Sequence, residues 1–175
     1  MLLELQELRQ ERYSLLVITK AAELHSALLE SLSFFSAKKI PGVYASLTKP
    51  TRLLQPELQT KNINLKNIIF MEGMVDESNE YPNVVFIPTL EDLTGITIAL
   101  ESFLKSYDGE KFFIVDSVEL LQLFNTLDLV TNFIWKITQL CSAHKTHCLM
   151  MVSKKVDDIL VKKITPFFEK TLYKT

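Results

Sequence analysis

One segment near the middle of the chain, residues 111–117 with the sequence KFFIVDS, constrains the fold more than any other. Four consecutive apolar residues run directly into an acid and a hydroxyl. A strand that is buried on both faces of a parallel sheet has such a continuous apolar run. We therefore expect this segment at the centre of a sheet, with Asp116 at the carboxyl end of its strand. Ligands of α/β proteins usually bind at that edge.

The rest of the chain alternates between apolar, β-rich runs and amphipathic segments, and this order predicts an α/β fold. The predicted strands are residues 13–19, 43–47, 68–71, 84–87, 112–115, 148–152 and 172–173. The predicted helices are residues 20–36, 51–60, 89–108, 126–143 and 157–163, and residues 117–124 are predicted to form a turn or short helix. Because β-α-β units are right-handed, we expect a three-layer, mostly parallel sheet with helices on both faces.

Three local predictions follow from the same patterns. Residues 72–82 hold acids, Gly73, Asn79 and Pro82, and are predicted to form an exposed loop. Thr51 is predicted to cap the helix that it begins. The long helix at 126–143 is predicted to face inward through Leu129, Phe133, Ile137 and Leu140, with Trp135 on or beside that face.

Length and composition bound the class of protein. The 175 residues can bury one sizeable core and are too few to argue for two domains, so we expect a single domain over residues 1–175. Apolar residues make up 47% and charged residues 23%, as in an ordinary globular domain. The net charge of −2 gives no broad attraction to nucleic acid or to an anionic membrane. Two cysteines favour a reducing, cytoplasmic location over a disulfide scaffold.

The first twelve residues have an amphipathic pattern of their own. Leu2, Leu3, Leu5 and Leu8 stand among charged residues, which predicts a short helix over residues 1–12. That helix would lie either on the domain or on a protein partner, and periodicity does not separate these alternatives. The charges are unlike a signal peptide, and no stretch reaches the ~20 apolar residues that span a bilayer, so we expect no membrane partner.

Several residues of metal-binding type are close together in sequence. Cys141, His144, His147 and Cys148 are all of types that bind zinc. The first two are near a predicted helix end whereas Cys148 begins a predicted buried strand, so convergence on one metal is not expected. We interpret them as buried cysteines and surface histidines without a metal. His25 has no nucleophile partner and is predicted to be a solvated helix residue.

Asp116 and Ser117 are the clearest candidates for a functional site. Asp116 with Ser117 could bind a metal or cap the turn that follows. A lone aspartate at a strand end more often accepts hydrogen bonds from backbone N–H groups, and we favour that structural role.

The order of these motifs resembles the RecA/KaiC-like ATPase superfamily, and especially the small KaiC-like domains common in archaea, from residue 13 to the end. The resemblance rests on residues 15–19, 42–47 followed by Pro50, 82–88 followed by Thr89-Leu90, and 112–117. It implies a RecA-type core with Asp116 in the magnesium-associated acid position. It also implies self-association or pairing with an active relative.

Two departures from the family pattern decide the functional prediction. A phosphate loop needs G-x-x-x-x-G-K-[ST], because backbone N–H groups surround the phosphates while the lysine reaches their outer oxygens. After Thr19 this chain has residues 20–26, KAAELHS, with no glycine and with an acid. The family's catalytic glutamate follows the second strand, where this chain has Thr48 and Lys49. We therefore predict no ATPase activity and no cofactor.

These considerations leave three hypotheses. The first is a non-catalytic RecA/KaiC-like domain that acts through protein contacts, as a regulator or an oligomer subunit. The second is a sensor that binds a nucleotide or other small ligand without hydrolysis, near Thr19, Thr48, Asp116 and Ser117.

The third hypothesis is nucleic-acid binding at the basic carboxyl-terminal region. Lys154-Lys155 and Lys162-Lys163 give that region its positive charge. We favour a solvated face over a nucleic-acid partner there, because Phe167 and Phe168 lie beside a proline and resemble packing residues.

Overall fold

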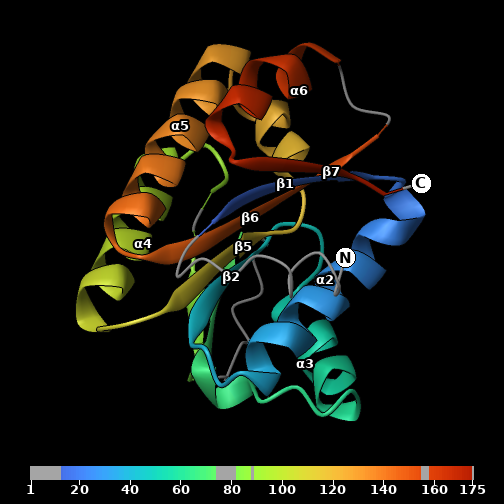
Figure 1. Ribbon diagram of the computed structural model, residues 1–175, viewed down its shortest axis with the longest axis vertical. Helices are drawn as coiled ribbons and strands as arrows, with labels where there is room; N and C mark the ends of the chain where they lie inside the picture. The colour runs from blue at the N-terminus through green and yellow to red at the C-terminus, as the bar shows by residue number, and fades with distance from the viewer. Residues whose placement is uncertain (1–12, 74–81, 88, 155–157, 175) are drawn as a thin grey trace.

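The structure is a computed structural model, and it describes residues 13–73, 82–87, 89–154 and 158–174 (Figure 1). The predicted amphipathic helix at 1–12 lies outside the described residues, as does the stretch 74–81 of the predicted loop. Within the described ranges, seven strands form one sheet in the order β4-β3-β2-β5-β6-β1-β7, and all neighbouring pairs are parallel. The strands are β1 (Ser14–Thr19), β2 (Gly42–Ser46), β3 (Ile68–Glu72), β4 (Val84–Phe86), β5 (Lys111–Val115), β6 (Thr146–Ser153) and β7 (Lys170–Tyr173).

Helices cover both faces of this sheet. The α-helices are α2 (Ala21–Ala37), α3 (Thr51–Thr60), α4 (Leu93–Ser106), α5 (Leu127–Ala143) and α6 (Asp158–Ile164), and the short 3₁₀ helices are η1 (Leu65–Asn67), η2 (Val118–Leu123) and η3 (Thr165–Phe167). Residues of α2 and α3 belong to one core cluster and residues of α4, α5 and α6 to the other. Figure 1 shows the two groups of helices on opposite sides of the sheet. The predicted three-layer α/β fold is confirmed.

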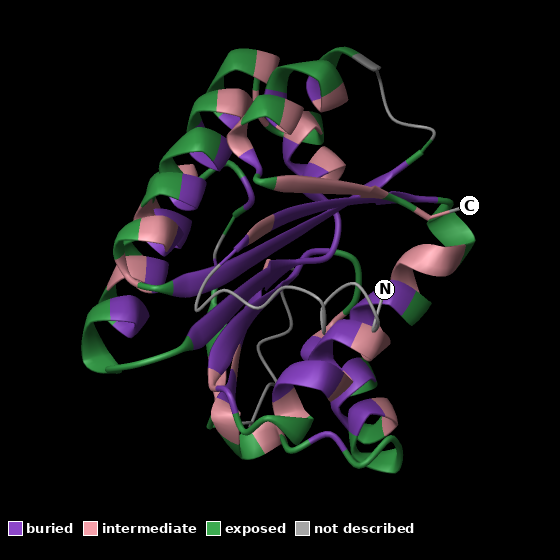
Figure 2. Ribbon diagram, in the orientation of Figure 1, coloured by how far each residue is buried: buried purple, intermediate pink, exposed green. Residues whose placement is uncertain are grey.

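Strand β5 is the fourth of the seven strands, as the apolar run at 112–115 predicts. Its side chains alternate between the two cores, with Phe112 and Ile114 on the side of α2 and Phe113 and Val115 on the side of α4 and α5. All four are almost completely buried, and Figure 2 shows the same burial along the neighbouring strands. A strand with two buried faces has no polar face, which is why its sequence pattern is so distinctive.

A close approach between β2 and β5 requires a glycine. Gly42 is paired with Phe112 in the parallel register, and a Cβ atom added at Gly42 would overlap the Phe112 ring. That ring cannot easily move, because it is fully buried and stacks on Phe35 of α2 with 4.5 Å between ring centroids. The glycine therefore lets α2 pack directly over the centre of the sheet.

Helix α4 begins at Leu93, four residues later than the sequence predicts. The side chain of Asp92 accepts a hydrogen bond from the Gly95 backbone N–H at 2.7 Å, which satisfies a free donor of the first turn. Asp92 is therefore the N-cap and not an acid within the helix.

Helix α5 is rotated relative to the predicted inward face. Leu129 is 54% exposed, so its predicted inward position is wrong, and Trp135 is 52% exposed. The buried stripe instead runs through Val130, Ile134, Ile137 and Cys141. Phe133 and Ile137 of the predicted set are buried as expected, so the centre of the buried face lies only slightly away from the predicted one.

Glu72 is the last residue of β3 and is buried, so the prediction of an exposed loop is wrong at this position. Its carboxylate accepts a hydrogen bond from the Thr51 backbone N–H at 3.1 Å, at the start of α3. A helix amino terminus favours a negative charge, and this placement supplies one. The predicted side-chain cap by Thr51 does not form: Pro50 occupies the N-cap position.

His147 was predicted to lie on the surface, and this prediction is wrong. Its side chain is 2% exposed on β6, and its Nε2 atom lies 2.6 Å from Oε1 of Glu110. The rings of Tyr13 and Phe35 lie beside the imidazole, with centroid distances of 4.3 and 5.6 Å. Burial lowers the pKa of His147, and the hydrogen bond to Glu110 opposes that effect.

We predict that protonation of His147 destabilises the fold. A lowered pKa in the folded state means that the unfolded chain binds the proton more tightly. The contribution of neutral His147 to stability should therefore be complete above pH 6.5 and decline as the pH falls below it. Urea unfolding between pH 5 and 8, at roughly half-unit steps, measures this slope.

The variant His147→Gln should show a weaker dependence of the free energy of unfolding on pH in that window. The matched control is His144→Gln, which removes a histidine outside the core and leaves His147 in place. Parallel slopes for wild type and His147→Gln would contradict the prediction.

Candidate functional site

A cavity of about 460 Å³ opens at the carboxyl ends of the central strands. Its volume is in the range of small-molecule sites, which is roughly 300–1,000 Å³. Four segments of the chain contribute its lining: α2, the residues after β2, the residues after β5, and the end of β6. The lining residues are Ala21, Leu24, His25, Leu28, Thr48, Lys49, Asp116, Ser117, Glu119 and Ser153.

Three of the four residues predicted to bind a ligand are brought together here. Thr48, Asp116 and Ser117 all line the cavity. Thr19 does not line it: its side chain is completely buried at the end of β1, and its hydroxyl has no hydrogen-bond partner among the described residues. Thr19 is paired in the sheet with Ser153, so it lies beside Ser153 and one strand farther from Asp116.

Asp116 is held by donors from the neighbouring strand β2 and the residues after it. Oδ1 accepts a hydrogen bond from the Leu47 backbone N–H at 3.0 Å. Oδ2 accepts one from the Tyr44 hydroxyl at 2.9 Å and two from Thr48, at 2.6 Å from its hydroxyl and 3.3 Å from its backbone N–H. The interpretation of Asp116 as an acceptor for backbone N–H groups is confirmed.

The position of Asp116 also affects its protonation. Burial raises the pKa of Asp116, whereas the hydrogen bonds from Thr48, Leu47 and Tyr44 lower it. Burial likewise raises the pKa of Tyr44 well above its ordinary value, and the charge of Asp116 adds to that effect. Tyr44 therefore remains a hydrogen-bond donor at neutral pH.

Glu119 is a second acid in the cavity that the sequence analysis did not select. Its Oε1 atom accepts a hydrogen bond from the Ser153 backbone N–H at 3.0 Å. Its Oε2 atom is buried and has no hydrogen-bond partner among the described residues. Burial raises the pKa of Glu119. The only signal in the sequence is its position three residues after Asp116, where a 3₁₀ turn returns the side chain to the strand ends.

The connection from β1 to α2 is a single residue, Lys20. Lys20 has the extended backbone of an N-cap, and its side chain makes no capping hydrogen bond. The first turn of α2 carries an acid, Glu23. The chain thus enters the helix directly, without a loop that could fold around a bound group.

His25 is on the cavity side of α2 and is not a simple solvated residue as predicted. Its Nε2 atom lies 2.6 Å from Oε1 of Glu57 on α3, and both side chains are about one-third exposed. This hydrogen bond, with smaller contributions from the charges of His25 and Lys49, lowers the pKa of Glu57. The pair joins α2 to α3 at the rim of the cavity.

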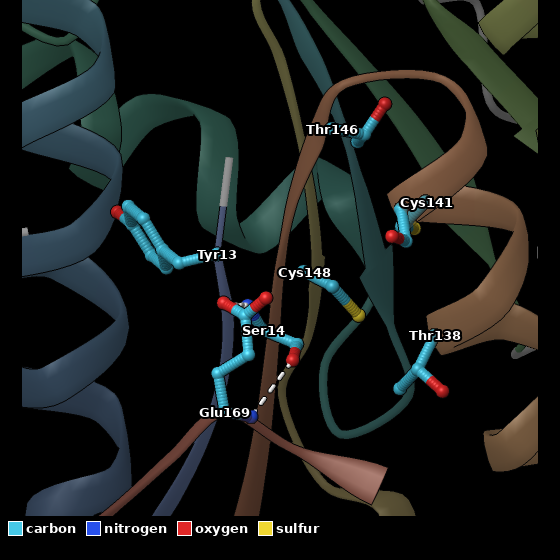
Figure 3. A pocket seen from close by; sticks show the side chains of 8 residues that line it. Tyr13, Ser14, Thr138, Cys141, Thr146, Cys148 and Glu169 are labelled. Carbon is cyan, nitrogen blue, oxygen red and sulfur yellow. Dashed lines mark hydrogen bonds between the residues drawn. The ribbon is translucent and has the colours of Figure 1, made fainter. Parts of the chain in front are cut away.

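A second, much smaller cavity of about 10 Å³ lies at the opposite, amino-terminal end of the sheet (Figure 3). Cys141 and Cys148 both line it, beside Ser14, whose hydroxyl accepts a hydrogen bond from the Glu169 backbone N–H at 3.0 Å. Figure 3 shows Cys148 directed toward α5, which carries Cys141, while Tyr13 points the other way. About one water molecule fits in such a volume.

This arrangement separates the four residues of the zinc hypothesis. His147 and Cys148 are consecutive in β6, so their side chains lie on opposite faces of the sheet. The contacts agree, because His147 meets Tyr13 and Phe35 whereas Cys148 belongs to the core under α5. Cys141 and Cys148 line the same small cavity, and neither His144 nor His147 lines it.

The basic carboxyl-terminal region is partly neutralised. Lys163 forms an ion pair with Asp128 of α5 at 2.7 Å, and Lys155 lies outside the described residues.

Across the described ranges, none of the helices combines the length and the apolar character needed to cross a bilayer.

The parallel sheet, its helical layers and the cavity at the carboxyl strand ends define an α/β domain of the kind that binds ligands at this edge. No family model matches the chain. No curated protein matches it either. Solved structures do resemble it, and they identify the fold.

The KaiC-like protein PH0186 from the hyperthermophilic archaeon Pyrococcus horikoshii OT3 superimposes with a TM-score of 0.67 and 10% identity, over 92% of this chain and 70% of that chain. A second protein of the same organism, PH0250, gives a TM-score of 0.63 and 14% identity, over 99% of this chain and 87% of that chain. An ATPase domain superimposes with a TM-score of 0.55 and 11% identity, over 94% of this chain and 69% of that chain. This chain therefore has a RecA/KaiC-like fold.

We predict that Asp116 is needed for stability. Asp116→Ala leaves the N–H groups of Leu47 and Thr48 and the hydroxyl of Tyr44 without their acceptor. Because Asp116 is 4% exposed, this change should lower the free energy of unfolding by about 3 kcal/mol. Urea denaturation monitored by circular dichroism measures the loss.

Asp116→Asn is the matched control, since it keeps the size of the side chain and one acceptor oxygen, and its loss should be smaller. An Asp116→Ala protein as stable as the wild type would contradict the structural role.

Proposed function

We propose that this protein is a non-catalytic RecA/KaiC-like domain that acts through protein contacts, as a regulator or as a subunit of an oligomer. The observation that supports it most is the engagement of Asp116. Among the described residues, Tyr44, Leu47 and Thr48 donate four hydrogen bonds to its carboxylate. A carboxylate that holds magnesium must direct lone pairs at the metal or at its water molecules.

The connection between β1 and α2 supports the same proposal. Phosphoryl transfer depends on positioning and on charge stabilisation around the phosphates. The single residue Lys20 between strand and helix leaves no loop of backbone N–H groups to provide them. Glu23 in the first turn of α2 would repel a phosphate.

Thr48 supports the absence of hydrolysis in a second way. The resemblance puts Thr48 and Lys49 where the family has its water-orienting glutamate. The Thr48 hydroxyl donates a hydrogen bond to Oδ2 of Asp116 at 2.6 Å, so its proton is already used within the protein. A neutral hydroxyl donor in this position is a poor general base.

Exposed apolar side chains on the described surface fit a role in protein contacts. Ile98 of α4 is 62% exposed and Trp135 of α5 is 52% exposed, and the two helices pack side by side. Leu129 on the same helix as Trp135 is also exposed. Tryptophan is enriched at the energetic centres of interfaces. These exposed side chains support a contact on α4 and α5.

In either role the protein should not turn over ATP, and as an oligomer subunit it should self-associate. Release of phosphate from ATP with Mg²⁺ should equal the no-protein blank. Light scattering over a concentration series should show an assembly larger than one chain. Trp135→Glu should shift that assembly toward the monomer, because it buries a charge in the apolar contact.

The control is Lys66→Glu. Lys66 is an exposed residue of η1, which packs on the face of the sheet that α2 and α3 cover. Turnover of ATP above the blank would refute the non-catalytic assignment. A wild-type protein that is monomeric at all concentrations would refute self-association.

The cavity favours a second candidate function, a sensor that binds a small ligand without hydrolysing it. Its volume of about 460 Å³ is sufficient for a metabolite, and Thr48, Asp116 and Ser117 line it. Position at the carboxyl strand ends is typical of ligand sites in α/β proteins.

Titration calorimetry tests this candidate with ATP, ADP and cyclic nucleotides, each with and without Mg²⁺. A nucleotide sensor gives saturable heat with the ligand recovered intact. Leu24→Trp, which places an indole at the cavity wall, should abolish that heat. No heat from any nucleotide would remove nucleotides as ligands.

A further inference from the structure

The two edges of the sheet differ in their protection against further strand pairing. Among the described residues, β7 forms one edge and β4 the other. Strand β7 begins with Lys170 and is flanked by Glu169 and Lys174, and charged side chains at an edge discourage pairing with another chain. Strand β4 and its neighbours, residues 83–87, carry no charge. The edge at β4 therefore lacks the protection that β7 has.

Neither helical layer fully covers β4. Successive side chains of a strand point to opposite faces of the sheet. Val85 is paired with Met71, which belongs to the core under α4, so Val85 lies on that face and Phe86 on the face that α3 covers. Val85 is 39% exposed and Phe86 is 46% exposed. Apolar side chains are thus accessible on both faces of this edge strand.

The backbone of β4 has hydrogen-bonding groups that point away from the sheet. The Asn83 carbonyl accepts a hydrogen bond from β3 and the Ile87 N–H donates one to β3, each at 2.8 Å. Because alternate residues of a parallel strand face a given neighbour, the N–H and C=O groups of Val84 and Phe86 point outward. No hydrogen bond to these outward groups is present among the described residues.

From these features we infer that β4 pairs with β4 of a second copy of this chain, antiparallel and centred on Val85, so that the two sheets become continuous. In this register Val84 of each copy lies opposite Phe86 of the other, and the two residues exchange N–H and C=O groups. A register centred on Val84 or on Phe86 would use the outward groups of one residue only. The strand is therefore complementary to itself, as a two-fold symmetric dimer requires.

The side chains suit the same pairing. Val85 would face its own copy, and Phe86 would lie beside Val84, so the cross-strand pairs are apolar and no like charges meet. Because β4 is three residues long, its hydrogen bonds alone would hold the dimer weakly, and the apolar pairs are needed as well. The inference goes beyond the proposed function, which relies on the surface of α4 and α5.

An introduced cysteine tests both the contact and its register. At a non-hydrogen-bonded position of an antiparallel pair, opposite Cα atoms are about 4.5 Å apart, a distance that a disulfide can span. Val85→Cys should therefore give a disulfide-linked dimer on oxidation with diamide, measured on non-reducing gels over time. The native Cys141 and Cys148 are buried, so the wild type should give no such dimer. Absence of the dimer in Val85→Cys would overturn the inference.

Phe86→Cys is the matched control, because it changes the next residue of the same strand and Phe86 is at least as exposed as Val85. In the proposed register, residue 86 and its own copy are diagonal neighbours, about 7–8 Å apart, which is too far for a disulfide. Phe86→Cys should cross-link at least about tenfold more slowly than Val85→Cys, because only the latter thiols are held together. Equal rates for the two variants would overturn the inference.

Phe86→Pro, added to Val85→Cys, removes an outward N–H and leaves the hydrogen bonds between β3 and β4 in place. Cross-linking should fall to the level of Phe86→Cys, and thermal melting shows whether the fold is retained. Phe86→Lys provides a second variant that keeps the backbone donor and places a charge at the edge, with the same expected fall. Cross-linking that persists in both variants would overturn the inference.

Trp135→Glu separates this dimer from the contact on α4 and α5. Added to Val85→Cys, it should leave cross-linking unchanged, because α5 packs over β6, beyond β5 from β4. Loss of cross-linking in this variant would overturn the inference. If cross-linking is unchanged and Trp135→Glu does not affect the wild-type assembly, the α4 and α5 contact falls and the β4 dimer remains. The non-catalytic proposal is decided separately by ATP turnover.

Discussion

The carboxylate of Asp116 joins the ends of the two central strands, and the rest of the site depends on it. Asp116 follows β5, and its donors lie in β2 and immediately after it. Burial of a carboxylate is costly, and four hydrogen bonds offset that cost only when the two strand ends hold their relative position. The interaction therefore fixes the polar wall of the cavity and makes Asp116 a structural residue first.

The sheet could be predicted from the sequence because buried parallel strands leave few alternatives. The run at 112–115 has no polar face, so a central position is the only one that suits it. Buried polar residues could not be predicted in the same way. His147 is buried because Glu110, 37 residues away, approaches its ring, and Glu72 is buried because it meets the start of α3. Such partners are distant in sequence, and local periodicity carries no information about them.

The residues of the candidate site also fall into two groups, those that local sequence predicts and those that long-range contacts bring together. Thr48, Asp116 and Ser117 were predicted because they follow strands whose carboxyl ends meet at one edge. Thr19 also ends a strand, but β1 is separated from β5 by β6, and local sequence patterns do not give this strand order. Glu119 and Ser153 were missed because each resembles an ordinary residue until the 3₁₀ turn and the end of β6 bring them together.

A RecA/KaiC-like fold does not determine the ligand at its carboxyl edge. The sheet supplies the edge and Asp116, whereas affinity for phosphate comes from the connection between the first strand and its helix. In this chain that connection is Lys20 alone, and the helix that follows turns Ala21, Leu24 and Leu28 toward the cavity. The side chains at this edge therefore differ in kind from one helix to the next, with an apolar wall from α2 and polar groups after β2 and β5.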